Sequence, residues 1–214
     1  MKVSVIISTY NREKYIGRSI RSLLDQAWSR ENYEIIVIND GSTDHTEAVL
    51  RAFGNAIKVV SLPENKGLPF ACNIGIKEAG GRFVVRVDDD DFVQEDFLKT
   101  LYNFLAMNKD FDAVACDYLL VDEKEEAIAK KNVTEEPIAC GIMFRKENLI
   151  DIGLYDENFL YREDEDLRLR YVKKYNIYRV ALPLYRYMMH SENMTNNKDK
   201  LNFFDKILKQ KHKK

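Results

Sequence analysis

The chain has 214 residues, of which 45% are hydrophobic, and its formal net charge is -2. This hydrophobic content is enough for a sizeable core, which argues against an intrinsically disordered protein. The nearly balanced charge argues against a dedicated nucleic-acid-binding protein, because neutralising phosphates requires a surplus of basic side chains. We therefore expect a folded protein with no nucleic-acid partner.

The cysteines and the apolar runs bear on where the protein works. Cys72, Cys116 and Cys140 are far apart and form no Cys-x-x-Cys pair, which favours a reducing compartment over a disulfide framework or a zinc site. The first residues become polar too soon for a signal peptide, and no apolar run approaches the roughly 20 residues that span a bilayer. We expect a cytoplasmic protein, with peripheral contact to the inner face of the membrane as an alternative.

Residues 1–91 alternate between patterns typical of buried strands and of amphipathic helices. Apolar, β-branched runs predict four buried strands, at residues 3–8, 34–38, 57–61 and 83–87. Helices are expected between them, the first two capped by Asn11 and Asp44 and the third over 68–79. This alternation predicts a parallel sheet with right-handed crossovers.

Residues 92–195 are less regular. The predicted elements are a helix over 94–107, a strand over 112–121, a hairpin turn over 122–126, a strand over 138–144 and a helix over 163–175. No repeat, low-complexity tract or linker interrupts the chain. Residues 1–195 are therefore predicted to form a single domain, followed by a basic helix or tail over 196–214.

Polar segments follow three of the predicted strands, at 8–11, 40–42 and 88–91. Ligands of open parallel sheets bind beyond the carboxyl ends of the strands, so these segments are expected to meet at one site. The first strand–helix turn holds no glycine, and the chain has no GxxxxGK[ST] sequence. A dinucleotide fingerprint and a P-loop are therefore excluded.

Four successive aspartates, Asp88 to Asp91, end the fourth predicted strand. They cannot all stay ionised together without a counter-charge, which a divalent cation supplies while also binding a diphosphate. Side chains alternate along an extended segment, so Asp88 and Asp90 are predicted to face one side and Asp89 and Asp91 the other. The alternative is a solvated acidic turn that caps the next helix, but the position at a ligand-binding edge favours the cation site.

Eight motifs in a fixed order carry a resemblance to a known family. They are VIISTYNR at 5–12, INDGSTD at 38–44, ENKG at 64–67, NIGI at 73–76, VDDDD at 87–91, GIMFR at 141–145, IGLYD at 152–156 and EDEDL at 163–167. With these motifs the chain resembles a family 2 glycosyltransferase over roughly residues 1–195. The resemblance implies the GT-A fold: an α/β fold whose Rossmann-like, mostly parallel sheet is flanked by helices, with a smaller acceptor-side region.

The resemblance also implies a division of labour. Residues 1–91 would form the nucleotide-sugar-binding half, and 92–195 the acceptor and catalytic half. The implied nucleotide-sugar-binding residues are Thr9, Tyr10, Asn11, Asp40, Ser42, Asn65, Lys66, Asn73, Asp88 and Asp89. Thr9 and Tyr10 would line the nucleoside pocket, with Asp40 on the base.

The implied metal is Mn²⁺ or Mg²⁺. Asp90 matches the direct ligand of the family's DxD motif, although a second DxD begins at Asp89, and His190 matches a late histidine that contacts the metal or the diphosphate. Asp164, with Glu163 beside it, matches the catalytic base. The alternative for this acidic pair is a charged first turn favoured by the helix dipole.

Physical chemistry agrees with these implied roles. An acceptor hydroxyl has a pKa far above 7, so its attack on a sugar needs a positioned base such as Asp164. A cation at Asp90 would stabilise the departing diphosphate on the other side of the sugar, which permits one displacement with inversion. We expect transfer from a nucleotide-diphosphate sugar, in particular a UDP-sugar, to a glycan or lipid-linked acceptor. The rival classes are a non-catalytic nucleotide-sugar-binding module and a sugar-phosphate nucleotidylyltransferase, which needs a glycine- and arginine-rich loop after the first strand.

Two further features qualify the resemblance. Cys72 stands where relatives often carry an arginine, so a cation near the nucleotide is expected from elsewhere, such as Arg86. The segment 198–214 places apolar residues at helical spacing among seven lysines. It is expected either to dock on the domain or to lie on an anionic membrane surface. His45 and His212 are expected to face solvent.

Overall fold

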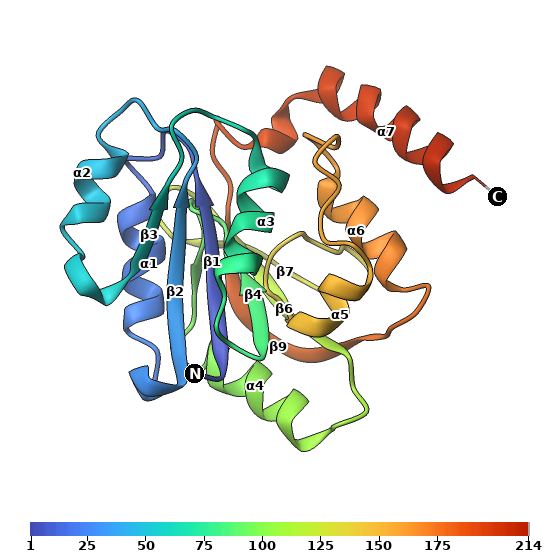
Figure 1. Cartoon of the computed structure of the whole chain (residues 1–214), viewed down its shortest axis with the longest axis horizontal. Helices are drawn as coiled ribbons and strands as arrows, with labels where there is room; N and C mark the ends of the chain where they lie inside the picture. The colour runs from blue at the N-terminus through green and yellow to red at the C-terminus, as the bar shows by residue number, and fades with distance from the viewer. Residues whose placement is uncertain (214) are drawn as a thin grey trace.

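The sheet is built outward from three almost fully buried strands and one edge strand. The computed structural model describes residues 1–213, and the first four strands are β1 (Val3–Thr9), β2 (Tyr33–Asn39), β3 (Lys58–Ser61) and β4 (Phe83–Arg86). They lie side by side in the order β3-β2-β1-β4, all parallel. The apolar composition of β1, β2 and β4 follows from this position, because helices cover both faces of the sheet (Figure 1). The parallel sheet predicted from the sequence is confirmed.

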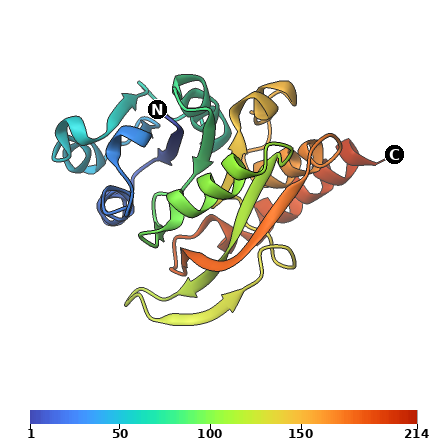
Figure 2. The same ribbon diagram turned by 90° about the horizontal axis from the view of Figure 1, so that it is seen from below.

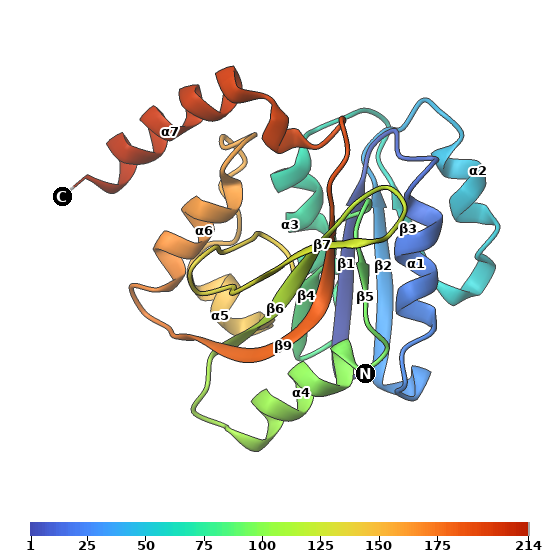
Figure 3. The same ribbon diagram turned by 180° about the vertical axis from the view of Figure 1, so that it is seen from behind.

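Helices on opposite faces shield this half of the sheet. They are α1 (Ile16–Leu24), α2 (Thr46–Arg51) and α3 (Leu68–Glu78), with the short 3-10 turns η1 (Arg30–Asn32) and η2 (Gly54–Ala56). Figure 1 shows α3 in front of β1, and Figure 3, from behind, shows α1 and α2 on the other face. A Cβ at Gly75 would overlap Ile6, so the glycine allows α3 to lie close against β1.

The second half extends the same sheet in mixed directions. Its strands are β5 (Phe92–Val93), β6 (Ala113–Val121), β7 (Ala127–Lys131), β8 (Ile142–Arg145) and β9 (Ile177–Met188). β8 pairs antiparallel with β4 and β6, β9 runs parallel to β6, and β5 closes the far edge against β9. Figure 2 shows β6 and β9 running side by side, with the β6–β7 hairpin projecting from them.

The remaining helices surround this mixed half. They are α4 (Phe97–Met107), α5 (Lys146–Asp151), α6 (Glu163–Tyr171) and α7 (Lys198–His212), with the 3-10 turn η3 (Met194–Asn196) before α7. α7 lies outside α6 in both side views (Figure 3). Within residues 1–213, no helix is both long enough and apolar enough to pass through a membrane.

The long strand β9 and helix α5 were not predicted. Pro183, in the middle of β9, argues against a central strand because proline cannot donate to the ladder. The structure accommodates it where the β6–β9 register shifts, next to Cys116 and Asp117. The regular ladder between β6 and β9 is interrupted at this point.

Asn11 is not the cap of the first helix, contrary to our prediction. α1 begins at Ile16, and Asn11 instead adopts a positive φ of 54°. Its side-chain oxygen accepts hydrogen bonds from the backbone N–H groups of Thr43 (2.8 Å) and Asp44 (3.4 Å). Asn11 therefore joins the turn after β1 to the turn after β2.

Candidate active site

The turns after β2 and β3 interlock at the carboxyl edge of the sheet. Asp40 is buried, and its two carboxylate oxygens accept hydrogen bonds from the backbone N–H groups of Lys66 (2.8 Å) and Gly67 (2.9 Å). Gly41 has a φ of 70°, and a Cβ there would overlap the backbone of Glu64. Asp40 thus fixes the turn whose side chains, including Asn65, are exposed.

The turn after β1 lies beside this pair. The Asn11 N–H donates to the Ser42 hydroxyl at 3.0 Å. The Thr9 hydroxyl is buried close to Asp89 but has no partner in hydrogen-bonding geometry. Tyr10 is 42% exposed although it follows a buried strand. An aromatic ring is therefore presented at the edge where the predicted nucleoside pocket would lie.

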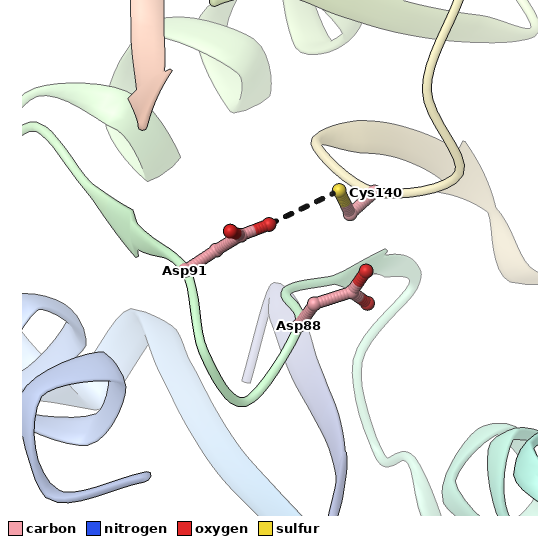
Figure 4. A group of neighbouring side chains, drawn as sticks. All are labelled: Asp88, Asp91 and Cys140. Carbon is pink, nitrogen blue, oxygen red and sulfur yellow. Dashed lines mark hydrogen bonds between the residues drawn. The ribbon is translucent and has the colours of Figure 1, made fainter. Parts of the chain in front are cut away.

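The acidic segment is a tight turn and not an extended strand end, so the predicted alternation of its side chains is wrong. The Asp91 N–H donates to the Asp88 carbonyl at 3.2 Å, and this turn brings the Asp88 and Asp91 carboxylates to the same side, next to Cys140 (Figure 4). Asp91 is buried and accepts from the Tyr185 hydroxyl at 2.7 Å and from the Met188 N–H at 2.8 Å. Asp91 therefore anchors the turn to β9.

Asp89 and Asp90 point to other partners. Asp90 Oδ2 is 2.9 Å from His190 Nε2, and the His190 ring stacks on Tyr15 with 4.6 Å between centroids. Burial, reinforced by the charge of Asp90, raises the pKa of Asp89 to about 8, and the Arg12 guanidinium 3.7 Å away opposes the rise. The turn thus gathers several carboxyl groups, and the nearby Arg12 offsets only part of their mutual repulsion.

Asp90 and His190 offer a carboxylate oxygen and an imidazole nitrogen, two ligand types that bind divalent cations. The two atoms are 2.9 Å apart, the distance of a direct hydrogen bond between them. A second group, Asp88, Asp91 and Cys140, has ligand atoms within 4.8 Å of one another. It fits less well, because both Asp91 oxygens are engaged and burial raises the pKa of the Cys140 thiol well above its usual value.

Arg86 connects the acidic turn to α6. Its Nε donates to Asp88 Oδ1 at 2.7 Å and its Nη1 to Glu163 Oε1 at 3.0 Å, and the side chain is only 10% exposed. A buried guanidinium held by two carboxyl groups is a rigid bridge, because moving either group away would leave a buried N–H donor without a partner. The predicted donor side and the predicted catalytic pair are therefore brought together.

The two members of the predicted catalytic pair differ in environment. Glu163 is buried against Arg86, whereas Asp164 is partly exposed and lines a small pocket with Ile138 and Ala139. Burial raises the pKa of Glu163 to about 7, and Arg86 opposes this rise. Of the two carboxylates, that of Asp164 is the more exposed.

Asn73 has a different position from the one expected of a ligand-binding side chain. It is buried, its Nδ2 donates to the Tyr155 carbonyl (3.0 Å) and to Glu157 Oε1 (2.9 Å), and its Oδ1 accepts from the Tyr155 N–H (2.9 Å). These partners occupy its amide. Asn73 therefore holds the segment before α6 against α3.

Several residues of this site were not anticipated. Tyr185 donates to Asp91 and accepts from the Asp88 N–H at 3.1 Å, and Tyr15 supports the His190 ring. Neither belongs to a recognisable motif. The only signal for Tyr15 is its position in the turn after the first strand, and for Tyr185 its nearness in sequence to His190.

Replacing Glu163 with glutamine is expected to flatten the pH dependence of stability. Because the folded state holds this proton up to a pH of about 7 and the unfolded chain releases it near 4.5, the free energy of unfolding should fall as the pH rises between these values. The slope is at most about 1.4 kcal/mol per pH unit for one group. Urea unfolding from pH 4.5 to 8 measures it, with the exposed Glu147→Gln as control. An unchanged slope in Glu163→Gln would contradict the assignment.

Fold and site together define the class. The parallel β3-β2-β1-β4 order, continued by the mixed strands β8, β6 and β9, is that of a GT-A α/β protein. A profile of glycosyl transferase family 2 matches residues 4–168, well over half of the chain, and the chain belongs to that family.

Individual relatives agree with this assignment. An uncharacterized glycosyltransferase of Rickettsia prowazekii (strain Madrid E) is 30% identical over 213 residues, which cover 91% of this chain and 66% of the relative. The structure of S. aureus TarS in complex with UDP aligns with a TM-score of 0.78 at 25% identity, over 88% of this chain and 61% of that one.

A third protein shares the fold alone. The mannosyltransferase PcManGT from Pyrobaculum calidifontis, in complex with GDP-Man and Mn²⁺, aligns with a TM-score of 0.76 at 20% identity, over 94% of this chain and 60% of that one. The present chain thus spans about two thirds or less of the length of these proteins.

Proposed function

We propose that this protein transfers a sugar from a nucleotide-diphosphate sugar to an acceptor hydroxyl, with inversion at the sugar carbon. The observation that carries the proposal is the Arg86 bridge, which links the acidic turn at Asp88 to the carboxylate pair at Glu163. One connected site then has a place for a diphosphate and its cation and, next to it, a base.

The donor side fits a nucleoside. Tyr10 offers an exposed ring for stacking, and the turn held by Asp40 presents Asn65 and Lys66 at the same edge. Thr9, Asn11 and Ser42 complete the predicted set there. UDP is the expected nucleotide, since S. aureus TarS was solved in complex with UDP and shares this fold. Asn73 would act by holding the segment before α6.

Asp90 and His190 would hold the metal, Mn²⁺ or Mg²⁺, with Asp88 and Asp89 nearby for the sugar and the diphosphate. When bound, the cation supplies positive charge that stabilises the departing diphosphate. A neighbour of the same fold, PcManGT, is in complex with GDP-Man and Mn²⁺, which supports manganese as the first metal to test.

Asp164 is the proposed base. Its carboxylate lines a pocket, whereas that of Glu163 is engaged by Arg86 and positions the first turn of α6. Asp164 would remove the proton from the acceptor hydroxyl as the hydroxyl attacks the sugar carbon opposite the diphosphate. A base and a leaving group on opposite sides of the sugar carbon are what a single inverting displacement requires.

The two rival classes are less well supported. A nucleotidylyltransferase would need a glycine- and arginine-rich phosphate loop after β1, but this chain has Thr9, Tyr10, Asn11 and Arg12 there. A non-catalytic binding module would have no use for a base set apart from the cation site. Measured turnover with a nucleotide sugar separates a module from an enzyme.

The predicted acceptor is a hydroxyl of a glycan or of a lipid-linked molecule. Membrane contact through residues 198–214 is also still a prediction. In α7, Leu208 is buried and the Phe204 ring lies next to that of Phe159. Part of the apolar face of α7 is therefore packed against the rest of the protein. Phe203 remains 59% exposed beside lysines and is the side chain available for a membrane surface.

A thermal-shift screen of UDP, GDP, ADP and their sugars, each with and without Mn²⁺, tests the donor class. We expect UDP to raise the melting temperature only when Mn²⁺ is present, because the cation is needed to offset the charge of both the diphosphate and the acidic turn. At a ligand concentration 100 times its Kd the stabilisation is about 2.7 kcal/mol. Equal shifts by all nucleotides, or by none, would contradict a specific nucleotide-sugar site.

A further inference from the structure

Helix α7 covers the segment that leads into the proposed catalytic pair. The Phe204 ring lies 6.2 Å from that of Phe159 and 5.9 Å from that of Tyr161, and Arg162 Nε donates to the Leu201 carbonyl at 3.3 Å. Figures 1 and 3 show α7 running along the outside of α6 and the loop before it. Residues 156–166 are thus held from outside by α7.

The end of α7 reaches a fully buried carboxylate on α6. Asp166 Oδ1 lies 2.7 Å from Lys211 Nζ and 2.8 Å from His212 Nε2, and Oδ2 accepts from Arg170 Nε at 2.9 Å. The expectation that His212 faces solvent is therefore wrong. Asp166 has no exposed surface, so its charge depends on these three partners.

Lys211 closes a clamp around the segment. Besides Asp166, its Nζ lies 2.7 Å from Asp156 Oδ2, and it sits over the Phe159 ring at 4.7 Å. One ammonium group thus joins the first and the last residue of 156–166. Between these two points lie Arg162, with a positive φ of 59°, and the pair Glu163 and Asp164.

The same segment also touches the donor side. A Cβ at Gly67 would be 2.8 Å from Leu160 Cδ2, so the loop packs directly on the turn fixed by Asp40. Leu160 is 46% exposed, which leaves this contact with little burial to maintain it. Contacts with α7 therefore support this loop from outside, while Asn73 at Glu157 and Arg86 at Glu163 hold it from inside.

We propose that Lys211 and Asp166 are positioning residues for the transfer reaction: the clamp that they form fixes the 156–166 segment and so places Asp164 toward the acceptor. This inference rests on the function proposed above. Neither residue touches the sugar. Their effect is carried by the first turn of α6, where Asp164 lies two residues before Asp166.

The test compares Lys211→Met with Lys209→Met. Lys209 lies on the same helix and forms an exposed i,i+4 pair with Asp205, so its replacement removes the same charge without touching 156–166. Lys211→Arg restores the charge. Each full-length variant is measured by hydrogen–deuterium exchange of peptides covering 156–166, by Mn²⁺-dependent UDP binding, and by donor and acceptor kinetics.

We expect Lys211→Met to speed exchange in 156–166 by roughly tenfold and to lower kcat by a similar factor, with UDP affinity unchanged. Lys209→Met should match the wild type, and Lys211→Arg should recover most of both losses. Equal exchange in Lys211→Met and Lys209→Met would overturn the clamp. If the wild type binds no nucleotide and turns over no sugar, the proposed function fails, but the exchange comparison still decides whether the clamp exists.

Discussion

Replacing Asp164 with asparagine is expected to lower kcat by roughly 10² to 10⁴-fold, the usual contribution of a positioned base. The substitution keeps the size and the hydrogen-bonding shape of the side chain but removes its ability to accept a proton. Asp164 lines a small pocket, and Glu163 and Arg86 connect its helix to the acidic turn. Mn²⁺-dependent binding of UDP should therefore stay at the wild-type level.

Steady-state turnover of a UDP-sugar and calorimetric titration with UDP and Mn²⁺ measure the two effects separately. Glu147→Gln is the matched control, since Glu147 is an exposed acidic residue in the first turn of the neighbouring helix α5. It should behave as the wild type in both measurements. Full turnover in Asp164→Asn would move the base to another residue and would leave the proposed inverting mechanism without support.

The second large effect is expected from Asp90→Asn, which should abolish the dependence of UDP binding on Mn²⁺ and lower turnover by roughly a hundredfold or more. A cation contributes several kcal/mol to stabilising a developing anion, and each 1.4 kcal/mol is a factor of ten in rate. His190→Ala should act in the same direction but less strongly, because an imidazole contributes no charge. This pattern is the opposite of that expected for Asp164→Asn.

To measure the metal dependence directly, Mn²⁺ is titrated at a fixed UDP concentration and the melting temperature is recorded at each Mn²⁺ concentration. If Asp90→Asn retained the dependence of the wild type, the cation would have to lie elsewhere. The group of Asp88, Asp91 and Cys140 would then be the next candidate, and Asp88→Asn the variant to examine.

The sheet and the location of the site could be predicted because both follow from local patterns. Apolar runs of five or six residues predicted the four parallel strands, and polar segments directly after three of them predicted where the candidate site lies. The side-chain directions could not be predicted in the same way. Whether Asp88 and Asp91 face one side depends on the hydrogen bond that closes their turn, and whether Pro183 is tolerated depends on a register shift set by β6.

Long-range polar partners were equally inaccessible from the sequence. The amide of Asn73 is taken by Tyr155 and Glu157, and His212 is drawn to a buried aspartate in α6. Each of these contacts joins positions more than 40 residues apart, where spacing carries no information. The resemblance to a family supplied ligand-binding residues only as implied roles, and the bridging position of Arg86 is visible only in the structure.

The way in which Asp40 and Gly41 lock two turns together has a consequence for how nucleotide preference could change. Both carboxylate oxygens of Asp40 already serve the backbone, and Gly41 leaves no room for a side chain, so neither position can vary without disturbing the architecture. Tyr10 and Asn65, by contrast, are exposed at the same edge. If the nucleotide binds as proposed, we expect base selectivity to be changeable at these two positions at little cost in stability.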